Sequence, residues 1–226
     1  QFSYAAWKGN KDNKFLRITT AKDKIDAIIK QYKILGCTSV IPFASYIYFS
    51  NEMNFYMNDC INTPEKLFKE LKEQNINAFI LMPGEKQELS NLIQNKKSID
   101  FWEDNLQNIK TKKIDSYDQS FPLDQLQENF KKYQKLIFSK NSKILIYALH
   151  KLKFLNIFQD INIFLKDHNK NYNYSILSGL NVSKQTDYDI AMHSESLFFI
   201  FKNEFGYDTL TVNGCFECES EKFSKV

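Results

Sequence analysis

The sequence predicts an α/β layer followed by a small α+β unit. Two short apolar runs of strand length, residues 38–42 and 78–82, flank a helix that begins near Thr63. Buried strands that alternate with helices are typical of an α/β layer. Beyond residue 156 the segments alternate around a turn cluster, which is typical of a hairpin. The expected parts are an α/β domain at residues 1–115, a helical connector at 116–156, the α+β unit at 157–218 and a charged tail at 219–226.

The composition is that of an ordinary globular chain. Of the 226 residues, 43% are hydrophobic and 15% are aromatic, which is enough for a sizeable core. The 30 Lys and Arg residues nearly balance the 27 Asp and Glu residues. A net charge of +3 without an Arg-rich stretch gives no reason to expect nucleic acid as a partner.

The cysteines and the beginning of the chain bear on its location and extent. No apolar run is long enough to cross a bilayer, and no signal peptide is visible. The four cysteines form no dense disulfide framework, so we expect reduced thiols and a cytoplasmic protein. The chain begins at Gln1, and its first residues have the composition of a buried strand. We therefore expect it to be the C-terminal portion of a longer protein.

The first half of the chain contains the clearest helix signals. Apolar residues recur at intervals of three and four over residues 15–35, which predicts an amphipathic helix ended by Gly36. Thr63 is a good N-cap and Pro64 suits the first helical position of the next helix. A turn at residues 83–85 follows the second apolar run, and α/β proteins place sites at the carboxyl ends of buried strands. An ordinary exit from a strand is the alternative.

Further helices and strands are predicted in the second half. Two helices are expected at 123–138 and 142–154, a hairpin at 157–167 and 172–177, strands at 187–192 and 208–213, and between these strands a helix at 195–204, capped by Ser194 and ended by Gly206. This order of elements is the reason for expecting a small α+β unit.

Residues 39–59 combine apolar runs with side chains that can hold a ligand or a metal. Such a mixture is expected in the wall of a site, where buried polar groups bond one another or a ligand. Glu52 is the candidate metal ligand or general base. The candidates for binding a substrate are Ser45, Tyr46, Asn54 and Asn58. The alternative is a strand end that leads into an Asn-rich capped turn.

The sequence contains none of the common catalytic or cofactor motifs. G-x-G-x-x-G, the P-loop, G-x-S-x-G and H-E-x-x-H are all absent. No histidine has a His or Cys at ligand spacing. We expect His150 to be a core or interface residue, His168 to be exposed and His193 to precede a helix cap. Cys215 and Cys218 form a C-x-x-C, but zinc needs a second pair and a redox site needs a helix N-terminus, so no function is expected for it.

Five blocks of the sequence together resemble the C-terminal portion of one group of metallo-β-lactamase-fold hydrolases. The blocks are Q-F-S-Y-A-A-W-K-G-N at 1–10, V-I-P-F-A-S-Y-I-Y-F-S-N-E-M-N-F-Y-M-N-D at 40–59, N-T-P-E-K-L at 62–67, M-P-G-E at 82–85 and G-Y-D-T-L-T-V-N-G-C-F-E at 206–217. This group is also similar to the C-terminal part of the CMP-N-acetylneuraminate hydroxylases. The resemblance leaves the middle of the chain uncovered.

The resemblance implies half of an αββα sandwich and a hydrolase that uses zinc or iron on a phosphodiester, an amide or a lactone. The family's H-x-H-x-D-H metal motif is absent from this chain. Where related enzymes have a further His in I-P-x-H, this chain has Ala44. Either Asn51 or Glu52 replaces that ligand, or the site differs. We therefore expect this chain by itself to hold no metal and to be inactive.

Two other hypotheses stay open, and a small-molecule or lipid-like substrate is the expected partner. The segment 187–213 resembles a sterol-carrier-like module, which holds apolar ligands between a sheet and a helix. Its helix has a broad apolar face made by Leu197, Phe198, Ile200 and Phe201; packing on its own sheet is the plainer explanation of that face. The chain would then be a binding module without chemistry. It could also be the accessory half of a Rieske-type hydroxylase.

Overall fold

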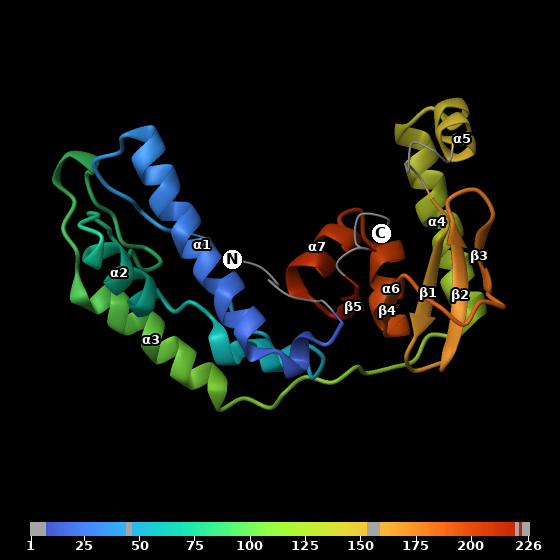
Figure 1. Ribbon diagram of the computed structural model, residues 1–226, viewed down its shortest axis with the longest axis horizontal. Coiled ribbons are helices and arrows are strands. Elements are labelled where there is room, and N and C mark those ends of the chain that lie inside the picture. The colour runs from blue at the N-terminus through green and yellow to red at the C-terminus, as the bar shows by residue number, and fades with distance from the viewer. Residues whose placement is uncertain (1–7, 44–46, 153–158, 220–221, 223–226) are drawn as a thin grey trace. The chain divides into compact units, whose positions relative to one another are not determined.

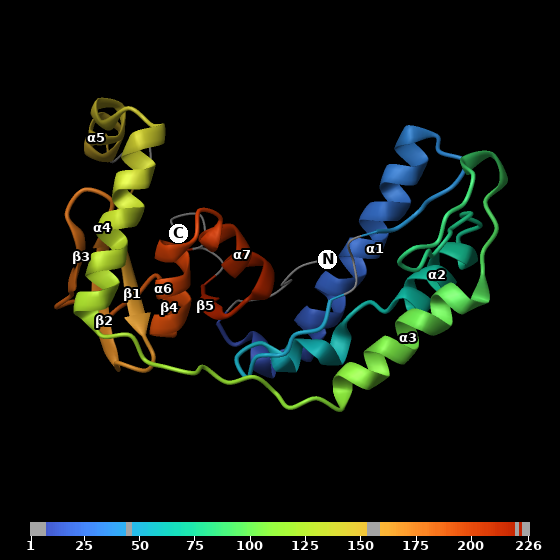
Figure 2. The ribbon, with the colours of Figure 1, turned by 180° about the vertical axis from the view of Figure 1, so that it is seen from behind.

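The computed structural model describes residues 8–43, 47–152, 159–219 and 222. The contacts within the chain define two units (Figures 1 and 2). The N-terminal unit comprises Asn10–Asp115, and the C-terminal unit comprises Ser116–Val226 together with Lys8 and Gly9. The chain is thus of mixed α/β content. No helix in the described ranges is long and apolar enough to cross a membrane.

The N-terminal unit is built from three α-helices and three short 3-10 helices among its described residues. These are η1 (Asn10–Asp12), α1 (Lys14–Leu35), η2 (Phe55–Cys60), α2 (Pro64–Glu73), η3 (Leu89–Asn91) and α3 (Lys96–Lys110). The predicted boundaries of α1 and α2 are confirmed. Gly36 ends α1 in the left-handed conformation with φ of 62°, and the Thr63 side chain accepts the Lys66 N–H at 3.2 Å.

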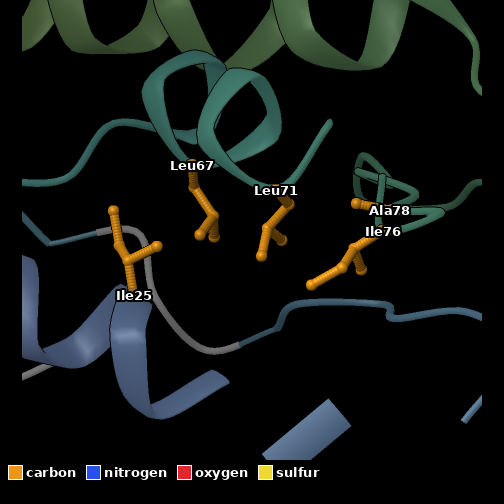
Figure 3. Packing of buried hydrophobic residues seen from close by; sticks show 5 residues of the cluster. All are labelled: Ile25, Leu67, Leu71, Ile76 and Ala78. Carbon is orange, nitrogen blue, oxygen red and sulfur yellow. The ribbon is translucent and has the colours of Figure 1, made fainter. Parts of the chain in front are cut away.

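A small apolar core joins α1 to α2. Figure 3 shows Ile25 of α1 facing Leu67 and Leu71 of α2, with Ile76 and Ala78 completing the cluster. All five are buried. Burial of each large aliphatic side chain stabilises the fold by roughly 1.5–3 kcal/mol. The periodicity that predicted the two helices therefore also identified the residues that hold them together.

The predicted strands at residues 38–42 and 78–82 are absent, and a single parallel bridge between Val40 and Ala78 stands in their place. The physical reason is that side chains form hydrogen bonds with backbone N–H and carbonyl groups of residues 78–82. A neighbouring strand would otherwise bond these groups. The Gln94 carboxamide accepts the Ile80 N–H at 2.7 Å and donates to the Ile80 carbonyl at 3.3 Å. Trp102 Nε1 donates to the Leu81 carbonyl at 2.9 Å. The described residues of this unit therefore contain no sheet, and half of a sandwich is not seen in them.

The C-terminal unit contains a five-stranded sheet and four helices among its described residues. These are α4 (Leu123–Lys140), α5 (Lys143–Lys151), β1 (Ile161–Leu165), β2 (Lys170–Ser175), β3 (Gly179–Val182), β4 (Ile190–Met192), α6 (Ser194–Lys202), α7 (Gly206–Asn213) and β5 (Phe216–Cys218). The order in the sheet is β3-β2-β1-β4-β5. Only the β1–β4 pair is parallel. The predicted hairpin is β1 and β2.

Helices cover one face of this sheet. Figures 1 and 2 show α4 lying along it. Alternate residues of β1 are buried, namely Ile161, Ile163 and Leu165. The central strands therefore present an apolar surface, as the alternation along β1 predicted.

The strand predicted at residues 208–213 is wrong, because this segment is the helix α7. The helix begins at Gly206, where we expected the preceding helix to end. A Cβ at Gly206 would lie 2.6 Å from the Ile200 Cα, so the close approach of α6 and α7 requires glycine. The Thr209 hydroxyl donates a hydrogen bond to the Phe205 carbonyl, and the Thr211 hydroxyl donates one to the Asp208 carbonyl. Such bonds make threonine acceptable in this short helix.

Candidate functional site

The asparagines predicted to bind a substrate bond the backbone of their own loop. Asn54 is buried, and its Oδ1 accepts the Asn51 N–H at 3.0 Å. Asn58 accepts the Phe49 N–H at 2.9 Å and donates to the Phe49 carbonyl at 2.6 Å. Asn51 in turn accepts the Met53 N–H at 2.9 Å. These bonds fit the alternative expectation of an Asn-rich capped turn.

The other predicted site residues do not join these asparagines in one cluster. Glu52 has an exposed side chain, and its backbone N–H donates to the Asp115 carbonyl at 2.8 Å. Ser45, Tyr46 and Ala44 lie outside the described residues. The loop is therefore organised by its own backbone hydrogen bonds, and Glu52 is its exposed carboxylate.

An arginine that sequence analysis overlooked holds this loop to α1. Arg17 is 4% exposed, and its guanidinium donates to both carboxylate oxygens of Asp59, at 3.0 and 2.7 Å. It also donates to the carbonyls of Asn10 and Lys11 and lies 5.3 Å from the Tyr56 ring. The hydrogen bonds from Arg17 hold the pKa of Asp59 below its usual value. A lone arginine in a helix gives no sequence signal that would distinguish it from a solvated one.

A cavity of about 830 Å³ lies in the N-terminal unit beside the predicted stretch. Its lining includes Ile28 of α1, Ile41, Phe43, Leu67 of α2, Leu81 and Trp102 of α3. The volume is in the range of small-molecule sites, about 300–1,000 Å³. The lining is mostly apolar, so a ligand in this cavity would make mainly van der Waals contacts and few hydrogen bonds.

The described residues do not fit the divalent metal that the resemblance implies. Among them, no group of three or more His, Cys, Asp or Glu side chains could hold a metal ion. The C-x-x-C also lacks thiolate character, because burial raises the pKa of Cys215 and of Cys218 to about 11. Both thiols lie on or beside strand β5 rather than at a helix N-terminus. This placement offers neither thiol the helix dipole that lowers a thiol pKa at redox sites.

Asp167 gathers several polar groups at the start of α6. Its carboxylate accepts the Ser194 N–H at 2.9 Å and the hydroxyls of Ser194 and Ser120, both at 2.5 Å. Burial raises the pKa of Asp167, but these hydrogen bonds outweigh burial and hold it below its usual value. The Nε2 atoms of His168 and His193 also lie near this carboxylate, each 3.7 Å from Asp167 Oδ2. The cluster fastens α6 to the turn between β1 and β2.

Two of the three histidines differ from expectation. His168 is half-buried rather than exposed, with Nε2 bonded to the Phe121 carbonyl at 2.9 Å and Nδ1 bonded to the Tyr172 hydroxyl at 2.8 Å. His193 is itself the N-cap of α6, because its Nδ1 accepts the Glu195 N–H at 3.2 Å. Both rings thus act in hydrogen bonds that fix the fold.

A second cavity, of about 180 Å³, lies within the C-terminal unit, between the sheet and its helices. It is lined by α4, β1, β2, β4, α6 and α7, through Tyr133, Ile161, Ile163, Tyr174, Ile190, Met192, Leu197, Ile200, Phe201 and Tyr207. Aliphatic, thioether and aromatic groups make up the whole lining. The predicted apolar face of α6 supplies three of these residues, which is the one part of this site that the sequence indicated.

Three tyrosines give the second cavity its only hydroxyl groups. Burial raises the pKa of Tyr133, Tyr174 and Tyr207, so all three are neutral phenols at physiological pH. Among the described residues, none of the three hydroxyls has a hydrogen-bond partner, and none is a fully buried atom left without one. Each hydroxyl is therefore reached by solvent and can bond water or a polar group of a ligand.

Comparison of the chain with protein-family models, with curated proteins and with solved structures gave no match. The likeness to metallo-β-lactamase-fold hydrolases therefore stays a prediction from the sequence.

Proposed function

We propose that the C-terminal unit binds a small apolar or amphipathic molecule between its sheet and helices α4, α6 and α7. The observation that supports this proposal is the 180 Å³ pocket, whose described lining is aliphatic and aromatic apart from three tyrosine hydroxyls and which is partly open to solvent. An apolar space of about 150 Å³ is large enough to hold benzene. Filling such a space with apolar atoms gains dispersion contacts and removes apolar ligand surface from water.

The size of the cavity defines the class of ligand. Its volume is below the range of about 300–1,000 Å³ that drug-sized ligands occupy. It therefore fits a small molecule, or one end of a longer chain whose remainder lies outside. The hydroxyls of Tyr133, Tyr174 and Tyr207 are suited to one polar group such as a hydroxyl. The described residues of the lining carry no carboxylate, imidazole or thiol, and we propose a binding role for them.

A series of n-alkanols, from butanol to decanol, tests this proposal by calorimetric titration. Each methylene that enters the cavity is expected to tighten binding by about 0.8 kcal/mol, roughly fourfold in the dissociation constant. The gain ends when the cavity is full. A series without such a dependence on chain length would show that the cavity takes no apolar ligand.

A matched pair of variants locates the binding. Leu197→Phe adds bulk to the cavity lining, whereas Leu89→Phe makes the same change at an exposed position of η3. We expect Leu197→Phe to weaken alkanol binding at least tenfold and Leu89→Phe to leave it unchanged. Circular dichroism and thermal unfolding establish that both variants are folded. Equal binding by the two folded variants would contradict the assigned site.

We also propose, as a second candidate, that the N-terminal unit supplies a substrate wall of the hydrolase implied by the resemblance. The supporting observation is the 830 Å³ cavity beside Ile41 and Phe43, which has the size of a small-molecule site. Trp102 lines this cavity. Titration with diphenyl phosphate is expected to give a saturable change in fluorescence that is lost in Trp102→Phe. Absence of a saturable change in the parent chain would rule out this wall for phosphodiesters.

A further inference from the structure

Positive charge is concentrated in one segment of the C-terminal unit. Residues 131–152 contain six lysines and no Asp or Glu, although the whole chain has a net charge of only +3. The lysines are Lys131, Lys132, Lys135, Lys140, Lys143 and Lys151. All six are exposed, and two of them, Lys132 and Lys140, form ion pairs with Glu128 and Glu204. The segment comprises the second half of α4 and all of α5, and Figure 1 shows these two helices one after the other.

The same segment exposes an apolar helix face. Ile144 is 83% exposed and Leu145 is 57% exposed, and Tyr147 and Leu152 are exposed beside them. Ile146, by contrast, is 2% exposed and anchors α5 from its other side. Spacing of 3.6 residues per turn places Ile144, Leu145, Tyr147, Ala148 and Leu152 on the outward side. The outward face of α5 is thus mainly aliphatic, where a solvated helix would be polar.

Two lysines lie on or directly beside this apolar face. The Lys143 ammonium lies 5.2 Å from the centre of the Phe138 ring, and the Lys151 ammonium lies 5.5 Å from the centre of the Tyr147 ring. Their aliphatic stems extend the apolar surface. Lys143 lies at the edge of the face, and Lys151 lies within it, between Tyr147 and Ile144 on the helical wheel. An apolar helix face that carries lysines whose long stems can reach outward matches a bilayer surface, where acyl chains lie beneath anionic headgroups.

We propose that α5, together with the end of α4, docks the protein on the surface of an anionic lipid bilayer. Ile144, Leu145 and Tyr147 enter the boundary between headgroups and acyl chains, and the lysines contact lipid phosphates. The helix lies in the plane of the surface and does not cross it. This inference is independent of ligand binding in the cavity, since it uses none of the cavity's residues.

Charge decides between a lipid surface and the two other occupants of such a face. A second copy docked through α5 would bring two lysine-rich segments together, and like charges repel. A nucleic acid would use the lysines but would leave the exposed aliphatic residues in water. Of these three occupants, the anionic bilayer satisfies both the lysines and the exposed aliphatic side chains.

Sedimentation with vesicles tests this proposal on the intact chain. We expect binding to phosphatidylcholine vesicles that contain about one third phosphatidylserine, and little binding to phosphatidylcholine alone. Binding to the anionic vesicles is expected to weaken as salt is raised, because exposed charges are screened. Equal partition to both kinds of vesicle, or to neither, would overturn the proposal.

Two double variants and their controls separate the apolar and electrostatic contributions. Ile144→Ser with Leu145→Ser removes the apolar face, and Lys143→Gln with Lys151→Gln removes two charges; each pair is expected to lower the partition coefficient at least tenfold. Each lysine alone is worth roughly fivefold. Val182→Ser and Lys184→Gln, at exposed sites on and just after β3, are expected to have no effect.

Three outcomes would contradict the docking surface. If only the lysine pair reduces binding, the protein adsorbs by charge alone. If the serine pair instead abolishes a dimer seen by light scattering, the partner is a second copy. If a short duplex DNA binds tightly and competes with the vesicles without any effect of the serine pair, the lysines serve a nucleic acid.

Discussion

Replacement of Arg17 by methionine is expected to destabilise the N-terminal unit strongly. Methionine preserves the aliphatic stem but removes four hydrogen bonds, two to the Asp59 carboxylate and two to the carbonyls of Asn10 and Lys11. Hydrogen bonds to charged groups contribute about 1.5–3 kcal/mol each. Removal of one partner of a buried ion pair costs about 3–5 kcal/mol. Because Asp59 is partly exposed and regains water, we expect a loss of about 3–4 kcal/mol.

Asp59→Asn is the matched change on the other side of the pair. Solvent screens the Asp59 charge because its side chain is 34% exposed, but Asp59→Asn leaves the Arg17 guanidinium, whose side chain is 5% exposed, without its counter-charge. We expect a loss of about 2 kcal/mol, smaller than for Arg17→Met because the hydrogen bonds to the Asn10 and Lys11 carbonyls remain. Urea unfolding followed by Trp102 fluorescence, in a Trp7→Phe background, measures both losses in the unit that contains the pair. Equal losses, or a loss below about 1 kcal/mol for Arg17→Met, would refute the view that the arginine joins η1, α1 and η2.

The pH dependence of the same pair has a definite sign. Hydrogen bonds from Arg17 lower the pKa of Asp59 in the folded state below its ordinary value of 3.8. A lowered folded-state pKa contributes stability that is fully present well above pH 3.8 and is lost as the pH falls through the folded-state pKa. The stability difference between the parent chain and Asp59→Asn is therefore expected to shrink in acid. A difference that stays constant below pH 3.8 would contradict this assignment.

Three other changes follow from the packing. Gln94→Ala leaves the Ile80 N–H and carbonyl without their side-chain partner and should cost about 1–3 kcal/mol in urea unfolding, whereas full stability would show that water replaces the amide. Gly206→Ala should lower the midpoint of thermal unfolding, because the new Cβ would meet the backbone of Ile200 at 2.6 Å; the usual slight gain from Gly→Ala would contradict this contact. Cys37 should react with iodoacetamide at pH 8 in the folded chain, while Cys215 should react only on unfolding, because it is buried and its pKa is about 11; mass spectrometry of timed samples distinguishes the two.

Helices α1 and α2 of the N-terminal unit were predictable because local signals mark a boundary of each. Gly36 ends α1 and Thr63 caps α2, so the information lies within a few residues of the boundary. Helix α3 was not predicted, although Asn95 caps it. The strands at 38–42 and 78–82 were not predictable in the same way. An apolar run of strand length gives burial, but a strand also needs a partner backbone, and here the Gln94 side chain, distant in sequence, supplies those hydrogen bonds.

In the C-terminal unit, the error at α7 has a similar cause. The alternation in residues 208–213 is the pattern of a half-buried strand, and threonine and valine favour strands. The helix forms because Gly206 permits close packing on α6, and because Leu210 is buried once α7 lies there. Tertiary packing thus overrides local preference. β5 escaped prediction for another reason: its three residues alternate in burial, but so short a run does not stand out in the sequence.

The loop at residues 49–59 shows what composition can and cannot say about a site. Asparagines among large apolar residues are expected in a ligand-binding wall and equally in a loop that caps its own backbone. The difference lies in whether hydrogen-bonding capacity remains after folding. Asn58 uses both its carbonyl and its amino group on Phe49, so the pairing that fixes the loop also occupies the amide.

The apolar cavity presents the reverse case. None of its ten lining residues is unusual for a core, and they come from six elements spread over residues 133–207. Only the gap left by their packing distinguishes them from ordinary core residues. Polar composition therefore pointed to a loop whose asparagine side chains already bond its own backbone. The pocket of the C-terminal unit arose instead from residues that have the composition of an ordinary hydrophobic core. A cavity forms where packed side chains leave space unfilled. That space depends on the tertiary packing of residues far apart in the sequence, so a local sequence pattern does not reveal it.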